Sequence, residues 1–172
     1  MVEEKVVLVD KNDNQIGLMP KMEAHHKGIL HRAFSIFIFN SENQILLQKR
    51  SPSKYHSGGL WTNTCCSHPR DGEDIIDAAA RRLSEEMGIK ADLKLAFNFT
   101  YRAELENGLI EHEFDHVLIG EFNGLPILNR DEAEDWKWIS IEDLRKDIKE
   151  NETDYTVWFV ICLLYTSPSP RD

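Results

Sequence analysis

Residues 67–89, SHPRDGEDIIDAAARRLSEEMGI, carry the clearest structural pattern in the chain. From about Asp74 to Met87 the apolar residues recur three and four positions apart, which is the spacing of one face of an α-helix. These residues are Ile75, Ile76, Ala79, Ala80, Leu83 and Met87. Gly88 stands where a glycine commonly ends a helix. The pattern therefore predicts a helix over residues 74–87 with one buried face.

Runs of apolar and β-branched residues on both sides of this helix predict strands. Before the helix the expected strands are Lys5–Asp10, Gln15–Leu18, Ala33–Phe39 and Gln44–Lys49, and residues 50–63 have the composition of a loop. After the helix they are Lys94–Ala103, Leu109–Phe122 and Trp136–Ile139. The pair Asn107-Gly108 between two of these runs is a strong hairpin signal.

Two more helices are expected towards the C-terminus. Ser140, followed three positions later by Asp143, predicts an N-cap for a helix to about Lys149. A final helix is expected from about Asp154. Strands flanking a helix, then a long hairpin and terminal helices, indicate an α/β or α+β sandwich.

The length of 172 residues suits a single domain, and neither an internal repeat nor a linker divides it. We expect that domain to cover residues 1–162. The last ten residues, LLYTSPSPRD, alternate proline with serine directly after an apolar run. Residues 163–172 are therefore expected to be a flexible tail or sequence foreign to the domain.

Composition narrows the classes of function. The net charge of −10 argues against nucleic-acid binding, which needs a basic surface. No apolar run approaches the roughly 20 residues that span a bilayer, and the N-terminus MVEEKVVLVD lacks the basic region of a signal peptide. We therefore expect a cytoplasmic protein that does not bind a membrane. The three cysteines, Cys65, Cys66 and Cys162, do not suggest a disulfide framework.

Histidines and acidic residues form a second pattern. His25 and His31 precede the strand at 33–39, His68 follows Cys66 by two positions, and Glu111 and Glu113 lie in one expected strand. Residues two apart in a strand project from the same face, so Glu111 and Glu113 point together. Imidazole nitrogens with carboxylate oxygens suit Zn²⁺ or Mn²⁺ better than Ca²⁺. Solvated histidines and an exposed acidic stripe are the alternative.

The helix and its preceding loop resemble the Nudix box, Gly-x5-Glu-x7-Arg-Glu-U-x-Glu-Glu-x-Gly-U, where U is a bulky aliphatic residue. Two positions depart, because Ser67 replaces the first glycine and Arg82 replaces the first glutamate of the helix. In Nudix hydrolases these glutamates bind divalent cations along a diphosphate and activate water. A guanidinium instead binds phosphate oxygens directly, so the change disfavours hydrolysis. An exposed helix with an Arg82–Glu86 ion pair is the alternative.

Together, the segments AHHKGILHRAFS, WTNTCCSHP, the altered Nudix helix and EHE resemble the metal-dependent isopentenyl-diphosphate isomerases, over about Lys5 to Trp158. The resemblance implies a Nudix-type α/β/α sandwich with a mixed sheet. It implies five ligands of a catalytic Zn²⁺ or Mn²⁺: His25, His31, His68, Glu111 and Glu113. It implies that Cys66 and Glu113 handle protons on opposite sides of the substrate, and that Glu86 binds a Mg²⁺ shared with the diphosphate.

The same resemblance implies a set of substrate-binding residues. Lys21, Arg50, Lys54 and Arg82 match positions that hold diphosphate oxygens, Tyr101 and Trp158 match active-site aromatics, and we add Ser67 to the set. Taken alone, a free cysteine in a strand such as Cys66 is more often a small buried hydrophobe than an acid or a nucleophile. Trp158 is equally well explained as an ordinary core anchor of the last helix.

The expected reaction is the isomerisation of isopentenyl diphosphate to dimethylallyl diphosphate by protonation and deprotonation. Two groups must remain on fixed sides of a flat alkene, in a site that excludes water from a carbocation. Which of Cys66 and Glu113 acts first stays open. The expected partner is a small diphosphate ester, with a monomer as the default. The alternatives are a Nudix diphosphohydrolase and a non-catalytic metal-binding module.

Overall fold

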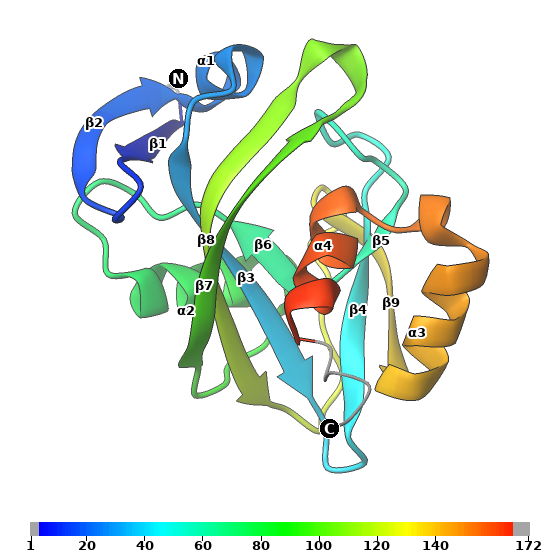
Figure 1. Cartoon of the computed structure of the whole chain (residues 1–172). Helices are drawn as coiled ribbons and strands as arrows, with labels where there is room; N and C mark the ends of the chain where they lie inside the picture. The colour runs from blue at the N-terminus through cyan, green and yellow to red at the C-terminus, as the bar shows by residue number, and fades with distance from the viewer. Residues whose placement is uncertain (1–3, 167–172) are drawn as a thin grey trace.

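The computed structural model describes residues 4–166. Within them, nine strands form one mixed sheet, and helices lie on both of its faces (Figure 1). The strands are β1 (Lys5–Val9), β2 (Gln15–Pro20), β3 (His31–Phe39), β4 (Gln44–Arg50), β5 (Trp61–Thr62), β6 (Cys65–Ser67), β7 (Lys94–Glu104), β8 (Ile110–Glu121) and β9 (Ala133–Ser140). The helices are α1 (Lys21–Lys27), α2 (Ile75–Met87), α3 (Ile141–Glu150) and α4 (Val157–Thr166). Two 3₁₀ turns are η1 (Glu106–Gly108) and η2 (Glu152–Asp154).

Strand β3 organises the sheet. It pairs in the antiparallel sense with β1, β4 and β6, and in the parallel sense with β8. The parallel register runs from His31 opposite Glu113 to Phe39 opposite Glu121. Strand β8 also forms the long hairpin with β7. The polar residues at the start of β3 therefore lie beside those near the start of β8.

Each face of the sheet has its own core. On one face α2 packs Leu83 and Met87 against alternate residues of β3, such as Phe34 and Ile36. On the other face α3 and α4 cover a second group, which includes Phe37, Leu47, Val117, Leu144 and Phe159. Alternation along β3 supplies both groups, because neighbouring residues of a strand point to opposite faces. These two cores define a three-layer sandwich, as the sequence predicts.

Helix α2 has defined ends. Asp74 is its N-cap and accepts hydrogen bonds from the backbone N–H groups of Ile76 and Asp77, at 3.0 and 3.3 Å. Gly88 ends it at φ 63°, and its N–H donates to Ser84 O. A Cβ at Gly88 would lie 2.8 Å from Ile127, so close approach also requires a glycine there.

The expected strands and the expected helices at 74–87 and 140–149 are confirmed, with ends that shift by a few residues. The short helix α1 and the strands β5 and β6 were not predicted, so the expectation of a loop over residues 50–63 is wrong at Trp61–Thr62, which pair with β4. The last helix begins at Val157, after η2. Of the predicted tail, residues 163–166 continue α4 and residues 167–172 lie outside the described part.

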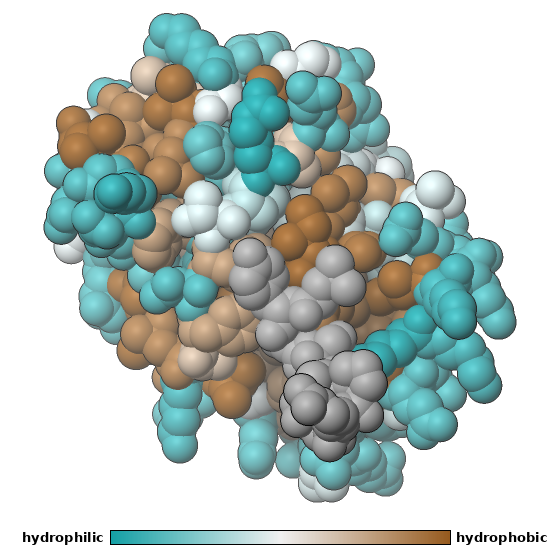
Figure 2. Space-filling view, viewed as in Figure 1, coloured by the Kyte–Doolittle hydropathy of each residue, from teal (hydrophilic) through white to brown (hydrophobic). Residues whose placement is uncertain are grey.

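The surface is polar at its edges. In Figure 2 hydrophobic residues gather over α4 and over the β1–β2 hairpin, where Ile16 is 66% exposed. Among the described helices, none combines the length and the apolar character needed to cross a membrane.

Candidate active site

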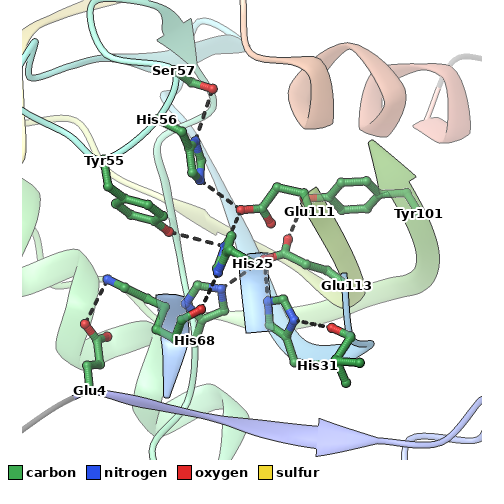
Figure 3. Close-up of polar contacts among 12 residues, drawn as sticks. Glu4, His25, His31, Tyr55, His56, Ser57, His68, Tyr101, Glu111 and Glu113 are labelled. Atoms are coloured by element: carbon green, nitrogen blue, oxygen red, sulfur yellow. Dashed lines mark hydrogen bonds and ion pairs between the residues drawn. The ribbon is translucent and has the colours of Figure 1, made fainter. Parts of the chain in front are cut away.

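Three histidines and two glutamates from distant parts of the chain meet at one buried point (Figure 3). His25 comes from α1, His31 begins β3, His68 follows β6, and Glu111 and Glu113 lie on β8. One ligand atom from each of His25, His31, His68 and Glu111 lies within 4.8 Å of the others. Glu113 joins through Oε2, which is 2.9 Å from His68 Nε2 and 3.4 Å from His31 Nε2.

Hydrogen bonds to the backbone fix the direction of two imidazoles. His25 Nδ1 lies 2.7 Å from Lys21 O, and His31 Nδ1 lies 2.9 Å from Ile29 O. A carbonyl oxygen can only accept, so in the neutral rings Nδ1 donates and Nε2 carries a lone pair. These lone pairs face carboxylate oxygens, with His25 Nε2 2.6 Å from Glu111 Oε1.

Facing lone pairs repel unless a proton or a cation lies between them. His31 Nε2 is also buried without a hydrogen-bond partner among the described residues. Nitrogen and carboxylate ligands with Nδ1–H groups held by carbonyls form a donor set that suits a divalent transition metal. These residues therefore fit a divalent cation, and the fit singles out neither zinc nor manganese.

Glu113 is held ionised by its neighbours. Burial alone would raise its pKa, but the contacts with His31 and His68 outweigh burial and hold the pKa well below its usual value. Tyr101, opposite Glu113 on β7, donates its hydroxyl hydrogen to Glu113 Oε1 at 2.5 Å. Burial, followed by the charge of Glu113, raises the pKa of Tyr101, so the phenol stays a donor.

The thiol of Cys66 lies in a polar setting next to this cluster. It donates to Asn63 Oδ1 at 2.9 Å and receives the indole N–H of Trp158 at 3.2 Å. Burial raises the pKa of Cys66 to about 12, so the group is a neutral thiol at ordinary pH. Cys65 points to the opposite side and is fully buried in the core beneath α2.

Two adjoining cavities of about 30 and 100 Å³ share Cys66 and Ser67 in their walls. The smaller one reaches Trp158 and Glu111. The larger one gathers the predicted diphosphate-binding residues Lys21, Arg50, Lys54 and Arg82, together with Glu86. A third cavity of about 650 Å³, around Phe39, Asp92 and Lys94, is lined by none of the predicted site residues.

The four basic side chains around the larger cavity have acidic or aromatic neighbours. Lys21 pairs with Glu4 at 2.9 Å and Lys54 with Glu132 at 2.6 Å. The guanidinium of Arg50 lies 5.1 Å from the centre of the Trp158 ring. The buried Nε atoms of Arg50 and Arg82 have no hydrogen-bond partner among the described residues, which suits an anion.

Arg82 and Glu86 form the i,i+4 ion pair that the alternative interpretation of α2 expects, at 2.6 Å. The pair is not on an exposed face, because Glu86 is 4% exposed. Glu86 also receives a hydrogen bond from Gln48 Nε2 at 3.1 Å. A cation at Glu86 therefore competes with Arg82 for the same carboxylate.

Sequence reasoning missed several residues that contact this site, among them Tyr55, His56, Asn63 and Glu132. Asn63 stands three positions before Cys66 within the segment WTNTCCSHP, and this closeness to the thiol is the one signal in the sequence that points to it. Tyr55 and His56 lie in a segment with loop composition, and Glu132 precedes β9. No spacing pattern links these three residues to the rest.

Comparisons with known proteins identify the family of this chain. The family model of the NUDIX domain matches residues 29–159. Isopentenyl-diphosphate Delta-isomerase 2 of Aromatoleum aromaticum is 54% identical over 162 residues, which cover 94% of this chain and 86% of that protein. Isopentenyl-diphosphate Delta-isomerase of Serratia proteamaculans is 51% identical over 159 residues, covering 92% of this chain and 89% of the relative.

Solved structures support the fold. The crystal structure of the Deinococcus radiodurans protein DR0079 aligns with a TM-score of 0.76 at 20% identity and covers 92% of this chain and 96% of its own. A MutT protein from Methanosarcina mazei Go1 aligns with a TM-score of 0.59 at 21% identity, over 68% of this chain and 81% of its own. The fold, the matched domain and the near full-length relatives lead to one conclusion. This chain belongs to the NUDIX family and, within it, to the isopentenyl-diphosphate Delta-isomerases.

Proposed function

We propose that this site converts isopentenyl diphosphate to dimethylallyl diphosphate, with Cys66 and Glu113 as its two proton-handling groups. A proton is added to the terminal carbon of the alkene and another is lost from the carbon on its other side, so the formula is unchanged. The observation that carries the proposal is the placement of one neutral thiol, held by Trp158, beside a buried ionised carboxylate.

The protonation states support this assignment. Cys66 holds a proton, because burial raises its pKa to about 12. Glu113 carries no proton and so has a site for one, because its contacts with two imidazoles outweigh burial and hold its pKa below the usual value. Moving a double bond requires such a pair, with one group able to give a proton and the other able to take one.

The remaining predicted residues hold the two ends of the substrate. Lys21, Arg50, Lys54 and Arg82 surround the larger cavity and bind the diphosphate there. The indole of Trp158 faces the alkene end, where a π face near a desolvated cation contributes on the order of 2 kcal/mol. Trp158 also packs in the core beneath α4, so it has a structural role as well.

The proposal includes two kinds of divalent cation. Zn²⁺ or Mn²⁺ is assigned to the three imidazoles with Glu111 and Glu113, and Mg²⁺ to Glu86 with the diphosphate. When bound, such ions fix the orientation of their ligands and shift the proton affinities of those ligands. We also propose that the chain is a cytoplasmic monomer whose partner is a small diphosphate ester.

Incubation with isopentenyl diphosphate and Mg²⁺ in D₂O tests the function. Deuterated dimethylallyl diphosphate is the expected product, and Cys66→Ala should lower its formation by about 10²–10⁴-fold, the usual contribution of a general acid or base. Cys65→Ala is the matched control, because this neighbouring thiol lies in the opposite core. Metal content is measured on the same samples. Release of free phosphate without isomerisation would instead identify a diphosphohydrolase.

A further inference from the structure

The loop between β4 and β5 brings a fourth imidazole to the metal cluster. His56 is 3% exposed, and its Nε2 lies 2.9 Å from Glu111 Oε1. The same oxygen lies 2.6 Å from His25 Nε2. In Figure 3 the carboxylate of Glu111 lies between His56, which descends from the loop, and the three other imidazoles.

The backbone of this loop is shaped to turn His56 inward. Ser57 has a φ of 53°, an unfavourable value for a residue with a side chain, and its N–H donates to the carboxylate of Glu106 on the β7–β8 hairpin. A Cβ at Gly58 would lie 2.8 Å from Pro52 O, so the next position needs a glycine. Arg50 donates to His56 O at 3.0 Å. These contacts hold the ring against Glu111.

The hydrogen bonds of His56 give it the opposite tautomer to His25. An ionised carboxylate only accepts, so His56 Nε2 carries the hydrogen that faces Glu111. Its Nδ1 then accepts, and the Ser57 hydroxyl lies 3.1 Å away to donate. His25, by contrast, donates through Nδ1 to Lys21 O and directs a lone pair at Glu111. One ring presents a lone pair to the cluster and the other presents a hydrogen.

We propose that His56 is a positioning residue for Glu111. It donates from Nε2 to Oε1, fixes the direction of that carboxylate and leaves a second lone pair of the oxygen for the divalent cation. His56 is not itself a ligand, since the four ligand atoms that converge within 4.8 Å come from His25, His31, His68 and Glu111. The inference rests on the metal assignment made under the proposed function.

Cobalt binding to the metal-depleted protein tests this role without any measurement of activity. His56→Leu should bind Co²⁺ about 10–100-fold more weakly in competition with a chelator, which is the usual effect of losing an outer-shell partner. The affinity of His56→Gln for Co²⁺ should stay within about a few-fold of that of the wild type, because the glutamine amide can donate from a similar position. His26→Leu is the control, since His26 is an exposed histidine on the same helix as His25.

X-ray absorption on the cobalt-loaded proteins separates a positioning residue from a ligand. The number of imidazoles around cobalt should be the same in the wild type and in His56→Gln. Loss of one imidazole in that variant would overturn the proposal, and so would unchanged cobalt affinity in His56→Leu shown to be folded by circular dichroism. Failure of the wild type to bind cobalt would remove the metal assignment and this proposal together, whereas the deuterium assay tests the isomerase independently.

Discussion

Cys65 and Cys66 are adjacent thiols, and strand β6 gives them different surroundings. Cys65 is fully buried among the apolar residues beneath α2. Cys66 faces Asn63, whose Nδ2 donates to Ile36 O and Cys65 O at 3.0 and 3.1 Å. Those two bonds fix the amide so that Oδ1 faces the thiol, and this oxygen accepts hydrogen bonds from the S–H of Cys66 and from the hydroxyl of Thr62, both at 2.9 Å. The sulfur lone pairs stay available to the indole of Trp158.

The N–H of Trp158 can be removed while its aromatic ring is kept. Trp158→Phe loses the 3.2 Å hydrogen bond to Cys66 Sγ. A net hydrogen bond is worth about 0.5–1.5 kcal/mol, so kcat should fall by up to about tenfold with KM nearly unchanged. Steady-state kinetics of isomerisation measures the effect. Trp138→Phe, in the core on the α2 face, is the control, and an equal loss in both variants would contradict the special role of Trp158.

The sequence predicts some residues of the site better than others, for a physical reason. Glu111 and Glu113 share a face because strand geometry dictates it, and Cys66 and His68 follow the same rule. His56 reaches the cluster through a loop whose path depends on Ser57, Gly58 and contacts with a hairpin far along the chain. No local periodicity describes such a path, so the tertiary structure is needed to find the residue.

Among the elements, α2 was predictable and α1 was not. Helix α2 has 13 residues, an N-cap and a C-terminal glycine, so its signals are strong and local. Helix α1 has seven residues, fewer than a helix needs to be stable alone in water. Buried Ala24 and His25 hold it against the sheet. Packing rather than propensity makes this helix, and the packing is invisible in the local sequence.

The N-cap of α2 gives a prediction at this scale. Asp74→Ala removes the acceptor for two backbone N–H groups and should lower the free energy of unfolding by about 0.5–2 kcal/mol. Asp74→Asn should retain most of the stability, because asparagine caps as well as aspartate. Urea denaturation measures both variants. Equal stability of the alanine and wild-type proteins would show that the cap contributes nothing.

At the scale of the whole molecule, the buried cluster links stability to pH when the metal is removed. Burial lowers the pKa of His56 and of His68 below 6.5. Glu113, despite its burial, is held below its usual 4.5 by its imidazole contacts. As the pH falls, these three groups therefore bind more protons in the unfolded chain than in the folded chain. His31 acts in the opposite direction, because its contact with Glu113 outweighs burial and raises its pKa. Asp115 also acts in the opposite direction, because burial and the charge of Glu113 raise its pKa. The two histidines outnumber Asp115 in the range below pH 6.5.

The metal-free protein should consequently lose stability as the pH falls below 6.5, where His56 and His68 act, and Glu113 should add to the loss only below 4.5. Thermal unfolding in the presence of a chelator at pH 7.5, 6 and 5, roughly spanning the range in which the two histidines act, measures the effect. The metal-loaded protein should show a steeper fall, since protons compete with the cation for its ligands. A melting temperature that stays constant or rises on acidification would contradict the assigned directions.

The parallel pairing of β3 with β8 also has a consequence for how the chain matures. His25 and Glu111 are 86 positions apart, and His31 faces Glu113 only when these two strands are in register. A chain that has formed only its local hairpins does not yet hold the imidazoles and carboxylates close together. Their approach requires the closure of a long loop, which is slow. We therefore expect the divalent cation to bind late in folding, and its binding in a refolding mixture should mark the moment at which β3 and β8 pair.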